Sequence, residues 1–254
     1  MNATQNVNQA PRLGNRLVLT GMLVAIASAI AMIFSGVGYR LDLWHFRVGF
    51  TILRWAFWFA LAGGVLSLAG LVIARDRPRA TIFAALIGII IGVVAVYIPW
   101  TWKQTLDSLP YIHDISTDTE NPPEFVPAAT LRKPGDHPVA YDGKEVADLQ
   151  HKAYADLAPL TTKASKEKVF EAAKAALLSM GMHLADADPA QGRIEANHTS
   201  LLYGFTDDMV VRIATGADGT KVDARSKSRV GRSDLGQNAK RIRTFFGKLR
   251  ASLG

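Results

Sequence analysis

His113 and Asp114 are the first neighbouring residues in the chain that could do chemistry together. An imidazole beside a carboxylate can act as an oriented general base, or as half of a metal site. Adjacent residues rarely point the same way, and no H-x-x-x-H or H-E-x-x-H spacing accompanies this pair. His183 and His198 fall in expected strands and would meet His113 only through the fold. A histidine in a polar turn is therefore the favoured interpretation, and we expect no metal site.

Three arginines near the end of the chain are the strongest candidates for binding. Arg225, Arg229 and Arg232 lead into an expected helix that Ser233 or Asp234 would cap. Guanidinium groups and free helix amides suit a phosphate or a carboxylate. The competing interpretation, which is the favoured one, is that acidic residues of the same chain neutralise these arginines. Those acids are Asp207, Asp208, Asp223 and the carboxylates of residues 112–124. Asp234 could itself occupy the helix end.

Residues 221–230 alternate charged side chains with small or β-branched ones. A strand period of two puts every charge on one face and leaves Ser226 and Ser228 on the other. The small residues either let the final helix approach closely, which is favoured, or leave room for a ligand bound by the two hydroxyl groups. The residues that we take as ligand-binding candidates are Arg225, Ser226, Ser228, Arg229, Arg232, Asn238 and Arg241.

Other familiar reaction centres do not occur in the sequence. The absence of cysteine excludes disulfides, thiolate nucleophiles and cysteine-bound metals. There is no G-x-S-x-G elbow, Walker motif or dinucleotide glycine pattern, and the serines at 226, 228 and 233 lack an evident base. We therefore expect no cofactor.

These candidates lie in a half of the chain that predicts an α+β domain. Residues 165–180 carry an apolar face between a capping Ser165 and a terminating Gly181, and residues 235–249 repeat apolar residues at helical spacing. Strand patterns occupy residues 182–187, 193–202, 209–215 and 221–230, with a hairpin at residues 217–219. This order predicts an antiparallel sheet with helices on one face, as the core at 165–254. Residues 103–164, rich in Pro and Asp, form an extended connection ahead of it.

Three uncharged apolar stretches fill the first hundred residues, at about 17–39, 55–74 and 80–102. Each can cross a bilayer as a helix, since about 20 apolar residues suffice. None contains Asp, Glu, Lys or His, so ion paths and proton relays are disfavoured and the helices predict an anchor. Gly88 and Gly92 form a G-x-x-x-G, which allows close packing among the three helices, the favoured interpretation, or a homodimer.

The positive charge of the chain belongs to the membrane flanks. Of the net charge of +7, residues 1–102 supply eight Arg against two Asp, and the rest is nearly neutral. This distribution fits lipid headgroups and argues against nucleic acid as a partner. The tail 1–16 and the turn at 75–79 carry five basic residues, against four on the other side. The positive-inside rule then predicts a multi-pass inner (plasma) membrane protein with a cytoplasmic N-terminus and a periplasmic or extracytoplasmic domain.

Three separated blocks in the second half share a pattern. They are residues 112–118 with Asn121-Pro122-Pro123, residues 204–208, and the run at 222–242. In this order they resemble the bacterial and plastid family called domain of unknown function 1499, over roughly residues 109–250. The resemblance implies an envelope-associated domain, often behind membrane spans, and brings no established reaction and no site roles.

Two hypotheses of different classes follow. The first is a non-catalytic inner-membrane protein whose exported domain binds an anionic or amphiphilic envelope component, or a protein partner. The alternative is a membrane-tethered, hydrolase-like envelope enzyme that uses His113 and Asp114. The expected partners are the lipid bilayer, an anionic lipid or other envelope ligand, and a protein or second copy of the chain, but not nucleic acid.

Overall fold

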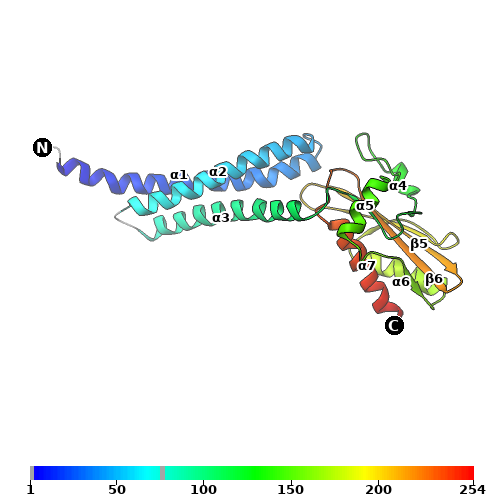
Figure 1. Ribbon diagram of the computed structural model, residues 1–254. Coiled ribbons are helices and arrows are strands. Elements are labelled where there is room, and N and C mark those ends of the chain that lie inside the picture. Colours follow the sequence, from blue (N-terminus) through cyan, green and yellow to red (C-terminus); the bar gives the residue numbers. More distant parts are fainter. Residues whose placement is uncertain (1–2, 75–77) are drawn as a thin grey trace. The chain divides into compact units, whose positions relative to one another are not determined.

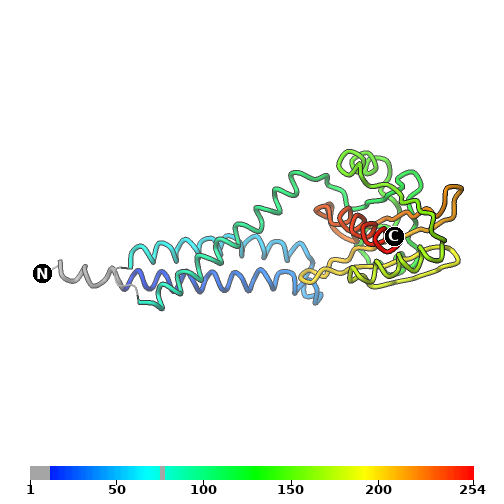
Figure 2. The backbone as a smooth tube through the Cα atoms, turned by 90° about the horizontal axis from the view of Figure 1, so that it is seen from below, coloured from blue at the N-terminus to red at the C-terminus, as the bar shows by residue number. Residues whose placement is uncertain are grey.

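The computed structural model describes residues 3–74 and 78–254 and divides the chain into two compact units. The first comprises Met1–Gln104 with Leu201–Gly204, and the second comprises Thr105–Ser200 with Phe205–Gly254. Figure 1 labels the helices and some of the strands, and Figure 2 follows the same backbone from a second direction. Residues 75–77, which carry part of the predicted charge asymmetry, lie outside the described residues.

Three long apolar helices make up most of the first unit. They are α1 Ala3–Arg40, α2 Phe46–Ile73 and α3 Arg79–Ser108. All three are long and apolar enough to cross a membrane, which confirms the expected spans. Each helix continues beyond its apolar stretch, so α1 begins inside the predicted tail 1–16. Adding polar turns to an existing helix costs little, because only the first turn must be nucleated.

Glycines set how closely these helices pack. A Cβ added at Gly63 on α2 would lie 2.7 Å from the backbone oxygen of Gly21 on α1. A Cβ added at Gly92 on α3 would lie 2.9 Å from the Cα of Gly64 on α2. Any side chain at these positions would push the backbones apart. The G-x-x-x-G at residues 88 and 92 is thus used between helices of one chain.

An antiparallel sheet forms the centre of the second unit. Its strands are β1 Asp114–Ser116, β2 Leu160–Thr162, β3 His183–Asp188, β4 Arg193–Thr199, β5 Thr206–Gly216 and β6 Gly219–Ser228. The order is β1-β6-β5-β4-β3, and β2 also pairs with β6. Strand β6 is therefore flanked by β5 on one edge and by β1 and β2 on the other.

Helices α6 Lys166–Ser179 and α7 Gln237–Leu253 cover one face of this sheet. The N-cap of α6 is the expected one, because the Ser165 hydroxyl accepts the backbone N–H of Lys168 at 3.3 Å. Apolar side chains of both helices and of alternate strand residues form one core, which includes Val169, Leu177, Ile194, Val211, Ile213, Ile242 and Phe245. The expected α+β fold is confirmed.

The structure differs from several of the predicted elements. Strand β4 ends at Thr199 rather than at residue 202, because residues 200–205 leave the sheet as a turn. Helix α7 begins at Gln237, because Gly236 before it has a left-handed conformation with φ 76°. The segment 103–164 also holds β1, β2, α4 Pro127–Thr130 and α5 Lys144–Ala153. Strands of three residues are too short to show a period of two.

Candidate functional site

The charged face of β6 that the alternation predicts is present, and it is buried. Asp223, Arg225 and Lys227 are almost inaccessible to solvent. They lie on the face opposite α6 and α7, under residues 117–143, a segment that we call the strap. Strand pairing adds two acids to this face, since Asp114 on β1 and Asp208 on β5 both lie opposite Lys227. The alternating charges of β6, which in the sequence suggest a solvent-exposed face, are therefore buried in the fold.

Asp114 occupies the centre of this interior. Its carboxylate accepts hydrogen bonds from Arg225 Nε at 2.9 Å and Nη2 at 2.8 Å, and it lies 3.1 Å from Lys227 Nζ. The side chains of Asp114 and Lys227 are 0% exposed. Charges removed so fully from water are tolerated only when they are paired and hydrogen-bonded. Asp114 is therefore committed to two cations and is enclosed.

Arg225 fastens the strap to the sheet. Its guanidinium also donates to the backbone oxygens of Pro123 at 3.1 Å and Val139 at 2.9 Å. The rings of Phe125 and Tyr141 lie 4.9 Å and 5.3 Å from its Cζ atom, on cation–π geometry. One side chain of β6 therefore contacts four residues of the strap.

Lys227 makes a second attachment between the sheet and the strap, and it binds the carboxylate that lies beside His113. Its Nζ donates to the Ala140 carbonyl at 2.7 Å and to Asp142 Oδ1 at 2.6 Å. The other oxygen of Asp142 lies 3.3 Å from His113 Nε2. The carboxylate beside the imidazole is therefore Asp142, whereas the adjacent Asp114 turns toward Arg225.

A second histidine stacks on His113. The ring of His137 lies 4.0 Å away at an interplanar angle of 25°, and its Nε2 is 2.9 Å from the Gly231 carbonyl oxygen. Burial lowers the pKa of His113, the neighbouring His137 lowers it further, and Asp142 opposes both effects. The other two predicted histidines, His183 and His198, lie on β3 and β4, and strands β5 and β6 separate β4 from β1.

Arg229 is held in the same way, by Asp208. Its Nε and Nη2 donate to the two oxygens of this carboxylate at 3.0 Å and 2.8 Å. Arg132 of the strap contacts the same carboxylate at 3.1 Å. At the other end of the sheet face, Asp118 of the strap pairs with Arg212 at 3.1 Å. Pairing within the chain, favoured from the sequence, is what the described contacts of Arg225 and Arg229 show.

Four further candidates meet on the opposite face of β6, against α7. The Ser226 hydroxyl donates to Asn238 Oδ1 at 2.7 Å, and Asn238 Nδ2 donates to the Ser228 hydroxyl at 3.0 Å. Arg241 donates to both Ser226 and Asn238, and to Asp207 at 2.7 Å. The structure therefore brings four candidates together, but it bonds them to one another. The small residues of β6 serve the close approach of α7.

Arg232 is the one candidate with an exposed side chain. It precedes the turn in which Asp234 accepts the backbone N–H groups of Gly236 at 2.8 Å and Asn238 at 2.7 Å. Asp234, not Ser233, therefore occupies the start of α7, and burial raises the pKa of this carboxyl. A protein carboxylate already stands where an external anion would bind.

Several residues of the buried face under the strap were not among the candidates chosen from the sequence. They are Asp142, His137 and Tyr141 of the strap, Lys227 on β6, and Glu195 on β4. Glu195 accepts the backbone N–H groups of Val126 at 2.7 Å and Ala128 at 3.0 Å, at the start of α4. The alternation of β6 could have identified Lys227. No pattern in the strap indicates which of its residues reach the sheet.

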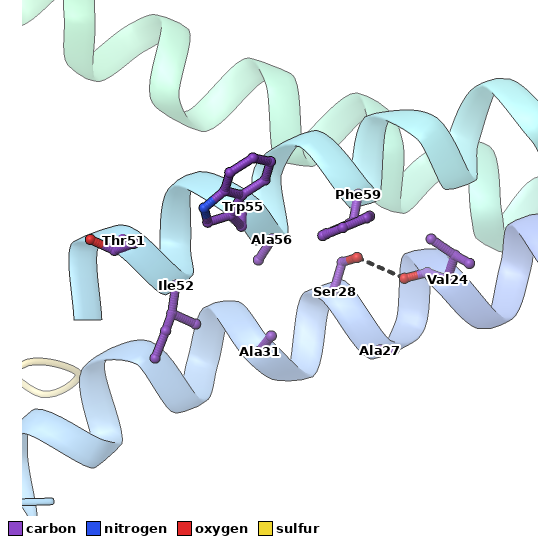
Figure 3. Close-up of a pocket in the computed structure, with 9 residues that line it drawn as sticks. All are labelled: Val24, Ala27, Ser28, Ala31, Thr51, Ile52, Trp55, Ala56 and Phe59. Carbon is purple, nitrogen blue, oxygen red and sulfur yellow. Dashed lines mark hydrogen bonds between the residues drawn. The ribbon is translucent and has the colours of Figure 1, made fainter. Parts of the chain in front are cut away.

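An apolar groove lies in the first unit, between α1 and α2. It has a volume of about 440 Å³. Ser28 donates within its own helix to the Val24 carbonyl at 2.7 Å. Figure 3 shows Phe59 beside Ser28 and Trp55 further along α2. Thr51, the other hydroxyl of the groove, also donates within its own helix, to Arg47. A groove with this lining suits a hydrocarbon chain and offers no group for acid–base chemistry.

A comparison with protein families matches most of the second unit. The model of the family described as "Protein of unknown function (DUF1499)" matches residues 114–249, from the first strand of the sheet into α7. No curated protein matches the chain.

Replacing the central carboxylate should loosen the strap. In Asp114→Asn the buried Arg225 and Lys227 lose most of their shared compensation, so we expect a loss of about 3–5 kcal/mol in the free energy of unfolding. Thermal unfolding of the full chain in detergent and hydrogen exchange across residues 117–143 measure this. The control is Asp148→Asn, at an exposed carboxylate paired with Lys144 on α5. Equal shifts in both variants would contradict the assignment.

The His113 environment also predicts a pH dependence. Because the pKa of His113 is lowered in the folded chain, the unfolded chain binds more protons between that pKa and about 6.5. The stability due to neutral His113 is fully present above pH 6.5 and is lost as pH falls through the folded pKa. Unfolding midpoints from pH 8 to pH 5 should show this loss, and His113→Gln should flatten it. His183→Gln, at an exposed histidine of β3, should keep the wild-type profile.

Proposed function

The chain belongs to the DUF1499 family, and from this premise we propose that it is a membrane-anchored, non-catalytic binding protein of the cell envelope. In this proposal its α+β unit attaches to an anionic surface through the exposed side of α7. The observation that carries the proposal is the division of basic residues in the second unit. Those on the sheet are paired inside the fold, whereas several on α7 face solvent.

Helix α7 combines an apolar face with a strongly basic one. It contains five basic residues and no acidic residue, namely Lys240, Arg241, Arg243, Lys248 and Arg250. Ile242, Phe245, Phe246 and Leu249 are buried against the sheet and α6. A helix of this kind is typical of a membrane-surface or anion-binding segment.

The charges of α7 are only partly compensated. Arg241 pairs with Asp207 at 2.7 Å, and Arg243 with Asp156 at 2.6 Å. For Lys240, Lys248 and Arg250, the described part of the chain supplies no acidic partner, and all three are exposed. Each Lys or Arg near an anionic bilayer contributes about 1 kcal/mol. Three such residues give weak attachment in solution, and tethering to three spans raises the effective concentration of the surface.

The sequence candidates contribute differently to this function. Arg225 and Arg229 are bonded to Asp114 and Asp208, so an external anion would have to displace a buried carboxylate. Arg232 is exposed ahead of α7 and can join the basic face. The enzyme alternative rests on His113, whose contact with Asp142 resembles an oriented base. It is weakened by Asp114, which is enclosed and cannot reach a substrate.

Neutralising the three exposed cations of α7 that have no acidic partner among the described residues should weaken attachment. The fragment 105–254 carries the apolar core of the second unit and can be tested on vesicles containing phosphatidylglycerol. In Lys240→Gln/Lys248→Gln/Arg250→Gln we expect binding to fall by about 100-fold, which corresponds to about 1 kcal/mol per charge. Binding of the unaltered fragment should weaken at high salt.

A variant with the same loss of charge elsewhere serves as the control. Lys152, Lys168 and Lys174 lie on α5 and α6, and their replacement by Gln leaves α7 unchanged. This variant should retain most of the binding. If it loses as much as the α7 variant, net charge and not α7 is responsible. If the unaltered fragment ignores anionic vesicles, the proposal fails.

The proposal places α7 outside the cytoplasm, with the N-terminus inside. Three spans put the two ends of the chain on opposite sides, and the count of basic residues favours a cytoplasmic N-terminus. In spheroplasts, protease should remove a C-terminal tag and leave an N-terminal tag intact. Protection of the C-terminal tag would reverse the orientation.

A further inference from the structure

The turn between β4 and β5 belongs structurally to the membrane helices. Residues Leu201–Gly204 group with Met1–Gln104, whereas Ser200 and Phe205 on either side belong to the second unit. A hairpin turn of a water-soluble domain would carry polar residues, but this one carries Leu201, Leu202 and Tyr203. The position of this turn in the sheet does not explain why its residues are apolar.

A buried hydrogen bond joins the turn to α1. The Tyr203 hydroxyl lies 2.9 Å from Ser35 Oγ, and both residues are buried. Ser35 donates its own hydroxyl proton to the Met32 carbonyl at 2.6 Å, so Tyr203 is the donor in this pair. The Tyr203 ring also lies 5.3 Å from the ring of Phe50 on α2.

Two glycines make the space for this contact. A Cβ added at Gly36 on α1 would lie 2.7 Å from Leu202 Cγ. One added at Gly49 on α2 would lie 2.5 Å from the Ser35 carbonyl oxygen and 3.4 Å from the Tyr203 ring. The turn therefore packs against the C-terminal end of α1 and the N-terminal end of α2. Arg40, the last residue of α1, donates to the Leu201 carbonyl.

The rest of the turn exposes apolar surface beside the helix ends. Leu201 is 88% exposed and Leu202 is 39% exposed. Leu41 and Leu43, in the connection between α1 and α2, are also largely exposed. Trp44 of the same connection donates its ring N–H to the Ser35 carbonyl at 3.2 Å. Tryptophan is enriched at membrane–water interfaces, so its presence here fits such a position.

We propose that the turn at Leu201–Gly204 inserts into the bilayer that α1 and α2 cross, with Leu201 among the lipids. The occupant of this apolar surface is lipid because the surface is continuous with helices that span the membrane. Arg40 marks the level of the headgroups, since a guanidinium at a helix end lies at the interface. The second unit then has two membrane connections, one through α3 and one through this turn. The inference does not depend on α7 and stands if the anionic surface fails its test.

A fluorescent label tests this directly, because the chain has no cysteine to remove. In the full chain reconstituted in phosphatidylcholine vesicles, Leu201→Cys is labelled with an environment-sensitive nitrobenzoxadiazole dye. Its emission should shift to the blue, and lipids with a doxyl group on the acyl chain should quench it. The control is Ala217→Cys in the exposed turn between β5 and β6, which should show water-like emission and no quenching.

Two results would overturn the proposal. Emission and quenching at position 201 equal to those at position 217 would place the turn in water. A blue shift without doxyl quenching would place it in a protein contact, such as one with a second copy. Tyr203→Phe in the labelled chain removes the hydrogen bond to Ser35 and should reduce the quenching at position 201, while position 217 stays unchanged.

Discussion

The second unit depends on the burial of Asp114 with two cations. Among the described residues, the strap places Phe125, Ala128 and Val139 in a small apolar cluster with Val210 on β5. The strap's position over the sheet is set instead by bonds to Arg225 and Lys227, whose buried charges are compensated by Asp114 and, for Lys227, also by Asp142. An ion pair of this kind adds little net stability compared with apolar packing, but it fixes one arrangement, since a shifted strap would leave charges unpaired.

The two faces of the sheet therefore work by different physics. The face under α6 and α7 is held mainly by apolar area, with one polar network between β6 and α7. The face under the strap is held mainly by directed hydrogen bonds to backbone carbonyls and carboxylates, which weaken when their geometry changes. This difference separates the basic residues into two groups. Those on β6 are used to build the fold, and those on the outer side of α7 remain available to a partner.

Repeating patterns explain how much was visible in the sequence. The apolar stretches are continuous, whereas the faces of α6 and α7 and the alternation of β6 follow a period, and all of them appear in the structure. The favoured interpretation that acids of the same chain neutralise the arginines needed only charge, whereas the individual pairs, such as Arg229 with Asp208, are seen only in the structure. The meeting of His113 with Asp142 was not predictable, because the strap has no period and its course is decided by which carbonyls Arg225 and Lys227 bind. Short β1 and β2 were missed because they form only against a finished β6.

That last dependence has a consequence for how the chain folds. One edge of β6 is covered by two three-residue strands, and the bond between Asp114 and Arg225 joins residues 111 positions apart. During synthesis β1 must wait until β6 has been made, so the charged strap stays solvated while α3 already lies in the membrane. Contacts this distant in sequence form slowly, and an open strand edge invites pairing with other chains. Until β1 and β2 cover this edge, the Lys and Arg residues of β6 disfavour its pairing with other chains. Once the edge is covered, the same residues hold the strap.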